Sequence, residues 1–503
     1  MKHILIQILC FLLLISMVGC GQEQGEAPVT TAAPSTVTTA PAEDQEYPYY
    51  GDNDFGNYEF RILNYDSYVE TNLRFAPEES SESDLLDSAM FKRNTLVEDK
   101  LNISIVEDRK GYSDLGGWGG QQQLGLLVYN SVFSGSYQWD VANVFPNWSP
   151  TLITDGMLMD LNAIEQLQLD EDYWDTDIMK EISLKGKCYA ASGKLTLMPF
   201  DLTWCLFFNE DMMVDLGLEK PYSLVDDMQW TMEKMFDYVK AGTKTGSGGT
   251  HDYENDATAI CGVATHESAP AYFVFAGGNP FMKINEKGDI LSNIQNERIY
   301  NTIELVQDMF SASNGYSNLG VSRPSDPTAS FGYLGMFVND RALFVAAEVK
   351  SASKFRAEMD STYGVLPIPM YDTAQGRYHS PLGAPAMIVV PNLQENLART
   401  GLILDAMAYE STPVMDLYYN QIVTHRNVTN PESERMINLV HDTLSVEFGM
   451  FYSFTNHYMD TLQKAIVAES ANPAGMGETE ADTIDLRVEK FLESLNKEAT
   501  ADS

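Results

Sequence analysis

Residues 58–65, YEFRILNY, alternate along the chain in the way of a half-buried β-strand. The next segment places apolar residues at roughly helical spacing between Asp84 and Leu101, with Ser83 or Asp84 as the N-cap. Residues 102–106, NISIV, then have the pattern of a second strand. A strand, a long helix and another strand in this order predict a βαβ unit, and hence a parallel or mixed sheet.

The same alternation of strands and helices continues through the chain, so the predicted fold class is α/β. Polar turns such as residues 242–250, GTKTGSGGT, separate the apolar segments, and no fixed repeat period appears. Further strands are predicted at 139–145, 186–191, 203–208, 260–263, 342–345, 364–367 and 386–391. Further helices are predicted at 229–240, 271–276, 298–310 and 393–409.

The composition is that of a large, acidic, globular chain. Its 503 residues are enough for two or three domains, and 44 % of them are hydrophobic. The formal net charge is −40, and no basic stripe interrupts it. Such a surface repels phosphate backbones and anionic lipid, which argues against nucleic-acid binding and predicts that any membrane link is covalent or embedded.

The first twenty residues have the features of an export signal. A short basic start at residues 2–3 precedes an apolar run at 4–18. The run is shorter than the roughly 20 residues of a spanning helix, so it predicts a signal peptide at 1–20. Residues 17–20, MVGC, resemble the bacterial lipobox, whose cysteine carries a diacylglycerol on its thiol. Cys20 is therefore the predicted lipidation site, with an ordinary cleaved signal as the alternative.

A low-complexity segment follows at 21–54. It is rich in Thr, Ala, Pro and Glu, and it has no Lys or Arg and no apolar periodicity. Such a segment cannot bury enough apolar surface to fold. We predict a disordered tether with a root-mean-square reach of about 30 Å. The tether would hold a folded body outside the cytoplasmic membrane, on its extracytoplasmic face, while keeping it attached.

Five cysteines are present in the sequence. Cys10 and Cys20 belong to the signal and the anchor, which leaves Cys188, Cys205 and Cys261 in the body. Three thiols cannot all pair internally. Cys188 and Cys205 flank a possible hairpin and could form a bridge, and buried free thiols are the other interpretation. There is no CxxC motif, so a thiolate zinc site is not indicated.

Four landmarks follow one another between about residues 58 and 495. The first is QWDV at 138–141 with DGMLMDL at 155–161; the second is LKGKCYA at 184–190, then LFFNE at 206–210, LGL at 216–218 and Pro221; the third and fourth are FVNDRALF at 337–344 and YGVLPIP at 363–369. In this order they resemble the extracellular solute-binding protein family 1, the sugar-type binding proteins of ABC importers. Residues 223–229 depart from the family pattern, in which the chain runs directly from Pro into a Thr-Trp helix start.

The resemblance implies a two-lobed, type II periplasmic-binding-protein-like fold, with a ligand cleft between lobes that are joined by hinge crossings. It implies a first lobe of about 55–200 plus 368–418 and a second of about 201–367 plus 419–500. It further implies a monomeric lipoprotein that is not an enzyme and that captures a sugar or oligosaccharide for ABC permease subunits. The alternatives are a lipid-anchored glycoside hydrolase and a surface lipoprotein that binds a peptide or protein.

Strand ends that open into loops supply the candidate ligand-binding residues, and the family's cleft positions fall in similar places. A sugar site needs aromatic platforms for CH faces, with carboxylates and amides for hydroxyls. Core packing is the alternative for each aromatic side chain. The candidates are Tyr65, Asn143, Phe145, Trp148, Asp201, Trp204, Tyr272, Glu348 and Tyr452.

Motifs for catalysis, metals and cofactors are absent or broken. The chain has no GxSxG and no HExxH, and residues 192–194, SGK, lack the rest of a P-loop. Residues 52–56, DNDFG, do not have the spacing of a calcium loop. The seven histidines form no ligand-like pair. We therefore expect no metal, no cofactor and no catalytic residue, although so acidic a chain leaves a glycosidase carboxylate pair open.

Overall fold

The computed structural model describes the chain from Tyr47 onward, with gaps. Met1–Glu46 and Tyr47–Ser503 are separate units. The predicted signal, Cys20 and the tether up to Glu46 lie outside the described residues, as does the predicted helix N-cap at Ser83 or Asp84. The described residues are 47–66, 74–77, 85–111, 114–115, 120–285, 289–320, 332–383, 386–426 and 430–501.

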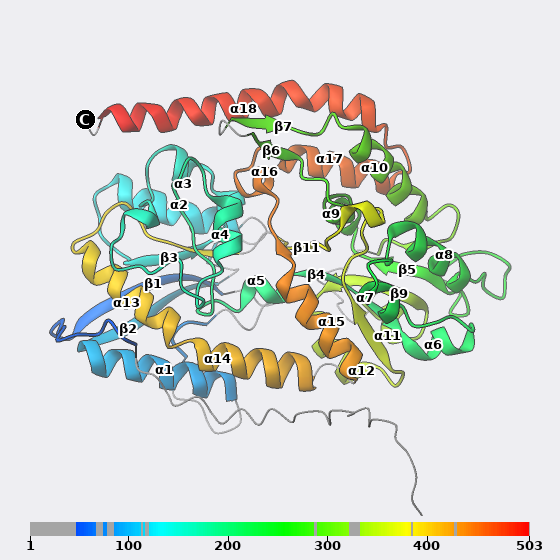
Figure 1. Ribbon diagram of the computed structural model, residues 1–503, viewed down its shortest axis with the longest axis horizontal. Helices are drawn as coiled ribbons and strands as arrows, with labels where there is room; N and C mark the ends of the chain where they lie inside the picture. The colour runs from blue at the N-terminus through cyan, green and yellow to red at the C-terminus, as the bar shows by residue number, and fades with distance from the viewer. Residues whose placement is uncertain are drawn as a thin grey trace, which may run out of the picture. The chain divides into compact units, whose positions relative to one another are not determined.

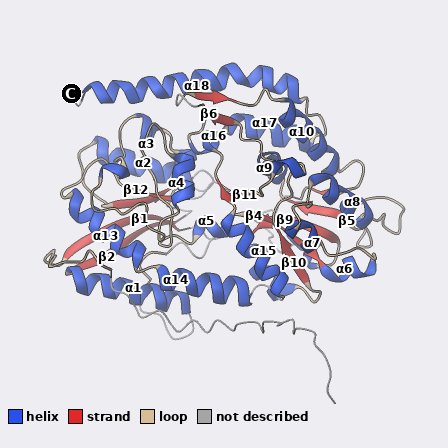
Figure 2. Ribbon diagram, viewed as in Figure 1, coloured by secondary structure: helices blue, strands red, loops and turns tan. Residues whose placement is uncertain are grey.

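The first sheet has four strands: β1 (Tyr58–Asp66), β2 (Ile103–Gly111), β3 (Val141–Val144) and β12 (Met387–Val389). Their order is β12-β3-β1-β2. Figure 1 labels β3, β1 and β2 of this sheet, and Figure 2 labels β12. β1 is parallel to β2 and β3, whereas β12 is antiparallel to β3. Helix α1 (Leu85–Leu101) connects β1 to β2. The predicted βαβ unit and the mixed sheet are therefore confirmed.

Side chains along β1 alternate between two apolar layers, as the pleat requires. Phe60 and Ile62 share one layer with α1 and with α13 (Leu397–Tyr409). Leu63 and Tyr65 share the other layer with α2 (Gly120–Phe133). Figure 2 shows α1 and α2 on opposite sides of these strands. We call this sheet and its helices the first lobe.

The second sheet has five strands: β4 (Trp204–Asn209), β5 (Cys261–Thr265), β8 (Ser317–Asn318), β9 (Ala342–Glu348) and β10 (Tyr363–Leu366). Their order is β10-β4-β9-β5-β8. β5 is parallel to β8 and β9, while β4 is antiparallel to both β9 and β10. All residues of β4 and β5 are buried, because helices cover both faces of the sheet. We call this sheet and its helices the second lobe. The covering helices include α8 (Met232–Gly242), α11 (Tyr333–Val338) and α15 (Pro431–Asp442).

Three segments carry the chain from one lobe to the other. The first contains α5 (Met198–Asp201) and leads into β4, and the second runs from β10 to β12. These two segments lie side by side, since the Gly383 N–H donates to the Leu202 carbonyl oxygen at 3.0 Å. The third contains α14 (Thr412–Asp416) and the π-helix η4 (Leu417–Arg426).

Shorter elements and the C-terminal helices complete the fold. The 29-residue helix α18 (Pro473–Ala501) contacts α3 (Thr151–Thr154) of the first lobe and α10 (Glu297–Met309) of the second. Within the described ranges, no helix is both long and apolar enough to cross a bilayer. The remaining elements are η1 (Pro146–Trp148), α3 (Thr151–Thr154), η2 (Leu161–Ala163), α4 (Thr176–Ile182), α6 (Glu210–Asp215), α7 (Tyr222–Asp226), α9 (Ala269–Ala276), β6 (Met282–Ile284), β7 (Ile290–Ser292), α10 (Glu297–Met309), α12 (Ser351–Glu358), η3 (Thr373–Gln375), β11 (Ser380–Pro381), β13 (Leu444–Ser445), α16 (Phe448–Phe451), α17 (Asn456–Val467) and α18 (Pro473–Ala501).

The predicted strand at 186–191 is wrong. This segment is fully described, and it holds only isolated bridges, one joining Leu184 to Lys187 and another joining Ala191 to Ile388. Lys185 and Gly186 both have positive φ, at 50° and 79°, which turns the chain back on itself. The alternation of side chains in this segment therefore belongs to a turn and an extended loop.

The body begins earlier than the predicted end of the tether at Asp54. Tyr47 and Tyr50 are 2 % and 5 % exposed, and the Tyr47 hydroxyl donates to Asp405 Oδ2 at 2.8 Å. Aromatic side chains at these positions supply the apolar area that folding requires. We call residues 47–55 the strap.

The three cysteines of the body are free and buried, so the Cys188–Cys205 bridge does not form. Buried free thiols, the other interpretation of the sequence, are confirmed. Burial raises the pKa of Cys188, of Cys205 and of Cys261, because the thiolate would lose its hydration.

Candidate functional site

The start of β4 and the end of β9 meet at one edge of the second sheet. Because these strands are antiparallel, Trp204 lies opposite Glu348. The parallel strand β5 ends at the same edge, where Thr265 lies opposite Ala346. The turn after β5 leads into α9, which carries Tyr272. This edge brings together three of the predicted residues, Trp204, Tyr272 and Glu348.

Trp204 and Tyr272 form a stacked pair. Their ring centroids are 5.2 Å apart and the rings are inclined by 24°. Trp204 is 5 % exposed. Its indole Nε1 is buried and has no hydrogen-bond partner among the described residues. A buried donor left unpaired costs about 1–3 kcal/mol, so this position calls for an acceptor oxygen.

Charged side chains border the stacked pair. Lys350 Nζ lies 3.0 Å from Glu348 Oε2. Burial raises the pKa of the Tyr333 phenol, and the Glu348 carboxylate contributes in the same direction. The His266 ring is 6.0 Å from the Tyr333 ring, and burial lowers the pKa of the imidazole. We call Trp204, Tyr272, Tyr333, Glu348 and Lys350 the second-lobe cluster.

Gly383, on the second crossing segment, packs against this cluster. A Cβ at Gly383 would lie 3.2 Å from Trp204 Nε1 and 3.7 Å from Glu348 Oε1. A larger side chain would crowd the indole N–H, whereas glycine leaves its surroundings open. The lack of a side chain at this position therefore matters for access to both polar groups.

Asp201 sits where the first and third crossing segments touch. Its side chain is buried, and its carboxylate accepts a hydrogen bond from the Tyr418 hydroxyl of η4. Its backbone carbonyl oxygen also accepts from the Lys350 N–H at 3.1 Å. This predicted ligand-binding residue therefore has a structural role at the crossing, next to the second-lobe cluster.

The predicted residues of the first lobe gather at the carboxyl ends of β1 and β3. The Tyr65 and Phe145 rings make an edge-to-face contact at 5.5 Å, and both are buried. Asn143 is 1 % exposed, and its Nδ2 donates to Asn64 Oδ1 at 3.0 Å. Asn143 Oδ1 has no partner among the described residues. Trp148, in η1, is 49 % exposed and is therefore available to a ligand.

Two asparagines that were not among the candidates meet beside Trp148. The Asn147 carbonyl oxygen accepts from Asn456 Nδ2 at 3.0 Å and from the Ser453 hydroxyl. The side-chain oxygens Asn147 Oδ1 and Asn456 Oδ1 are buried without a partner in the described part of the chain. Asn147 lies in the loop after the predicted strand at 139–145, but no local signal distinguishes Asn456 at the start of α17. No local signal in the sequence distinguishes Tyr333 or Lys350 either.

Tyr452 has a packing role. It is 2 % exposed, and its hydroxyl donates to the Ile182 carbonyl oxygen at 2.6 Å. Its ring stacks on Phe454 and packs against Phe448 and Phe491. Core packing, the alternative considered for every aromatic candidate, applies to this one because its hydroxyl is already paired to backbone.

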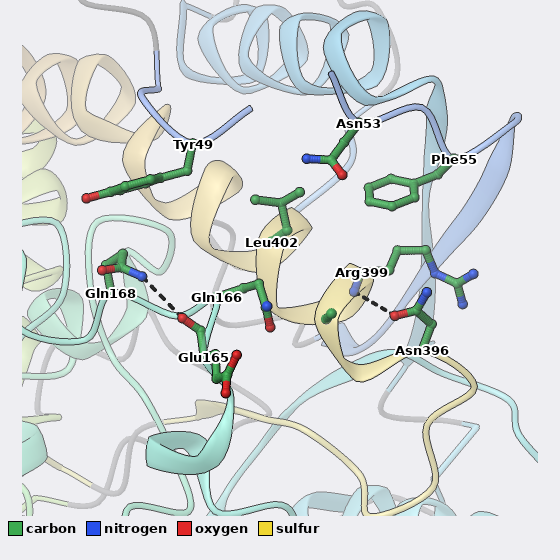
Figure 3. A pocket seen from close by; sticks show the side chains of 10 residues that line it. Tyr49, Asn53, Phe55, Glu165, Gln166, Gln168, Asn396, Arg399 and Leu402 are labelled. Atoms are coloured by element: carbon green, nitrogen blue, oxygen red, sulfur yellow. Dashed lines mark hydrogen bonds between the residues drawn. The ribbon is translucent and has the colours of Figure 1, made fainter. Parts of the chain in front are cut away.

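Two cavities lie away from the candidate residues. One, of about 430 Å³, is formed by the strap, the 165–168 loop and the start of α13; Figure 3 shows Leu402 between the Tyr49 and Phe55 rings in that view. Another, of about 260 Å³, lies between α4 and the β11–β13 region and is lined by Glu181 and His379. No candidate residue from the sequence lines either cavity. In the described residues, no group of three or more His, Cys, Asp or Glu side chains could hold a metal ion.

Comparison with solved structures shows what this architecture is similar to. No family model matches the chain, and no curated protein matches it. The galacto-N-biose/lacto-N-biose I-binding protein of an ABC transporter from Bifidobacterium longum, solved with lacto-N-biose, is 13 % identical with a TM-score of 0.56, and the match covers 87 % of this chain and 99 % of that one. An ABC substrate-binding protein from Listeria monocytogenes, in complex with cycloalternan, is 11 % identical with a TM-score of 0.54. That match covers 85 % of this chain and 98 % of the other.

A maltose/maltodextrin-binding domain from Bdellovibrio bacteriovorus, bound to maltotriose, is 12 % identical with a TM-score of 0.53, covering 86 % of this chain and all of that one. The chain has the fold of a type II periplasmic binding protein. At these identities the likeness shows the fold alone. The predicted two-lobed α/β class is confirmed, and the structural neighbours are sugar-binding proteins of ABC transporters, as the sequence resemblance predicted.

The candidate residues lie at one edge of each sheet, and a general rule for ligand binding in α/β folds applies to both edges. In open α/β sheets, ligands bind outside the carboxyl ends of the strands, and clefts between lobes are favoured small-molecule sites. In the second sheet, Glu348 lies at the carboxyl end of β9, opposite Trp204 at the start of the antiparallel β4, and Tyr272 lies on the helix that follows β5. In the first sheet, Tyr65, Asn143 and Phe145 lie at the carboxyl ends of β1 and β3.

Proposed function

We propose that this protein binds a small carbohydrate between its two lobes. Four buried polar atoms without described partners carry the proposal: the donor Trp204 Nε1 and the acceptors Asn143 Oδ1, Asn147 Oδ1 and Asn456 Oδ1. They come from both lobes and from the C-terminal helices. A polyhydroxylated ligand suits this mixture, because each hydroxyl both donates and accepts.

The second-lobe cluster adds what a sugar ring needs. The Trp204–Tyr272 stack offers an apolar edge to CH groups, and the Glu348 carboxylate beside it accepts from hydroxyls. Trp148 is the exposed aromatic of the first lobe. We propose that the Tyr65 and Phe145 rings line the site beside Trp148. Asp201 would stabilise the contact between the first and third crossing segments through Tyr418.

The lobes would close around the ligand by bending at the three crossing segments. The proposed boundaries are those expected from the sequence, about 55–200 plus 368–418 and about 201–367 plus 419–500. The strands of the two sheets fall within these ranges, and the strap adds residues 47–54 to the first lobe. No observation on the described residues singles out a pair of carboxylates for glycoside hydrolysis. We therefore propose a binding protein and not an enzyme.

We also propose that the protein is a monomeric lipoprotein that serves ABC permease subunits. The lipobox-like MVGC at 17–20 supports attachment through Cys20 to the extracytoplasmic face of the cell membrane. With a net charge of −40, the protein should be repelled by anionic lipid, which favours a covalent anchor over electrostatic attachment. Delivery to a permease rests on the likeness to ABC binding proteins.

A thermal-shift screen of the body, residues 47–503, tests the proposal. The panel is maltotriose, lacto-N-biose and cycloalternan with their component monosaccharides, and calorimetry then gives the affinity of any sugar that stabilises the protein. Trp204→Phe keeps a ring but removes the N–H, and we expect affinity to fall about tenfold. Trp230→Phe is the matched control, because its indole N–H is paired to the Pro367 carbonyl oxygen at 3.2 Å inside the second lobe.

The control should lose stability without losing affinity. If no sugar in the panel raised the melting temperature, carbohydrate binding would lose its support. Equal affinity of Trp204→Phe and wild type would remove Trp204 from the site.

A further inference from the structure

A chain of three buried polar side chains crosses the first sheet. Glu107 of β2, whose side chain is 2 % exposed, accepts from Asn64 Nδ2 of β1 at 2.7 Å. Asn64 Oδ1 accepts in turn from Asn143 Nδ2 of β3 at 3.0 Å. Both asparagines are almost fully buried. We call Glu107, Asn64 and Asn143 the relay.

The carboxylate fixes which way both amides point. Glu107 Oε2 accepts from the backbone N–H groups of Phe75 and Ala76, at 2.9 and 2.8 Å, so both carboxylate oxygens act as acceptors. Three N–H groups donate to this carboxylate and Arg109 Nε lies 3.9 Å from its Oε1, so Asn64 turns its NH2 toward Glu107 and its carbonyl oxygen toward Asn143. Asn143 must then turn its NH2 toward Asn64. Its carbonyl oxygen is left directed away from the relay, without a described partner.

We propose that Glu107 is a positioning residue that sets the hydrogen-bonding polarity of the ligand site through Asn64 and Asn143. This inference rests on the proposed carbohydrate function, because the group at the end of the relay is taken to meet the ligand. The relay presents an acceptor at that point, so the ligand must offer a donor there, a hydroxyl or an N–H. An ether oxygen or a carboxylate at the same position is rejected.

A single substitution should reverse this polarity. In Glu107→Gln, the amide oxygen of the new side chain stays with the Phe75 and Ala76 N–H groups, since these can only donate. The new NH2 group would then face Asn64, which must turn over to accept from it, and Asn143 must turn over as well. Asn143 would present NH2 where the native protein presents a carbonyl oxygen.

A second substitution should restore it. In Glu107→Gln combined with Asn143→Asp, the inverted Asn64 donates to one carboxylate oxygen, and the other again presents an acceptor at the end of the relay. The double variant thus has the native polarity with the charge moved from one end of the relay to the other. A merely structural role for Glu107 predicts no such rescue.

Calorimetry with maltotriose, or with lacto-N-biose where wild type does not bind maltotriose, tests the inference. We expect Glu107→Gln to weaken binding about tenfold or more, and the double variant to return to within about threefold of wild type. Glu98→Gln is the matched control, because its oxygen can still accept from the Ile105 N–H, and its affinity should be unchanged. Wild-type affinity in Glu107→Gln, or a double variant no better than Glu107→Gln, would overturn the proposal.

A ligand-independent measurement separates this inference from the proposed function. Selective ¹⁵N labelling of asparagine side chains, with Asn143→Asp to assign the signal, reports the amide of Asn143 in the unliganded protein. In Glu107→Gln its protons should lose their acceptor and shift upfield. An unchanged Asn143 signal would overturn the relay even if sugars bind, and a shifted signal with no sugar bound would leave the relay standing while the proposed function fails.

Discussion

Buried polar residues play two different parts in this protein. Asp405 is fully buried and accepts from the Tyr47 and Tyr173 hydroxyls at 2.8 and 2.9 Å, from Trp174 Nε1 at 3.0 Å and from the Gln168 N–H at 2.9 Å. Four donors satisfy this carboxylate, so it works as a structural anchor that holds the strap and the 165–174 loop on α13. Trp204, in contrast, has a buried donor that the described residues leave unpaired.

The two candidate tryptophans should respond differently to truncation. Trp148 is 49 % exposed, so Trp148→Ala should leave the melting temperature of the unliganded protein nearly unchanged while weakening sugar binding about tenfold. Trp204 is 5 % exposed, and Trp204→Ala should in addition lose about 3–5 kcal/mol of unfolding free energy. Melts and calorimetry on both variants check this. A large drop in the melting temperature of unliganded Trp148→Ala would indicate that Trp148 packs in the core and does not contact a ligand.

At the scale of elements, the short parallel pair β11–β13 places a titratable group between the lobes. His379, next to β11, lies 3.0 Å through Nδ1 from the Ser445 hydroxyl. Burial, with the Arg377 charge, lowers the pKa of His379 to about 4. Glu181 of α4 lines the same cavity, and burial raises the pKa of its carboxyl. The two groups therefore give stability opposite dependences on pH.

His379 should make the protein less stable as the pH falls. Its folded pKa lies below the ordinary value of 6.5, so its contribution is complete above pH 6.5 and is lost between there and about pH 4. Between pH 7 and pH 5, wild type should lose on the order of 2 kcal/mol more unfolding free energy than His379→Gln, because Gln does not take up a proton. Urea unfolding at both pH values measures it. Parallel losses in the two proteins would contradict the assignment.

At the scale of the whole molecule, three crossing segments join two lobes that each have their own sheet. The crossings touch through Gly383–Leu202 and Asp201–Tyr418 bonds, so bending at one segment must involve the others. Helix α18 contacts elements of both lobes and would have to slide or hinge as they move. A ligand that contacts both lobes favours the closed state by its difference in affinity for the two.

Saturation with a bound sugar should therefore reduce the radius of gyration of residues 47–503, since closure brings the two lobes together. Small-angle scattering with and without the sugar measures the change. Trp148→Ala combined with Trp204→Phe, which should bind about a hundredfold more weakly, is the control and should contract less at a sugar concentration that just saturates wild type. No contraction of wild type at saturating ligand would count against hinge closure.

The anchor gives a prediction for the full chain. Cys20→Ser removes the thiol that would be acylated, so the precursor should take up no labelled palmitate and should remain unprocessed at that site. Two acyl chains on one cysteine suffice for stable attachment, whereas one chain binds only reversibly. Equal labelling of wild type and Cys20→Ser would reject the lipobox prediction.

Local patterns in the sequence were sufficient for most elements of the fold. Alternation at 58–65 and helical spacing at 84–101 determine which face of each element is apolar, and this follows from the geometry of the backbone alone. The predicted β1, α1 and β2 therefore appear where expected. The pattern fails at 186–191, where positive φ at Lys185 and Gly186 turns the chain.

The partners of polar side chains depend on how the whole chain folds. Tyr47 docks on Asp405, 358 residues away, and Asn456 reaches the Asn147 carbonyl oxygen across 309 residues. Nothing local marks these pairs, because a hydrogen bond depends on which strands and helices pack side by side. Local patterns alone establish an α/β chain with aromatic and polar residues at strand ends. Strand order and register make Trp204 meet Glu348, and the packing of the folded chain determines which polar atoms remain unpaired.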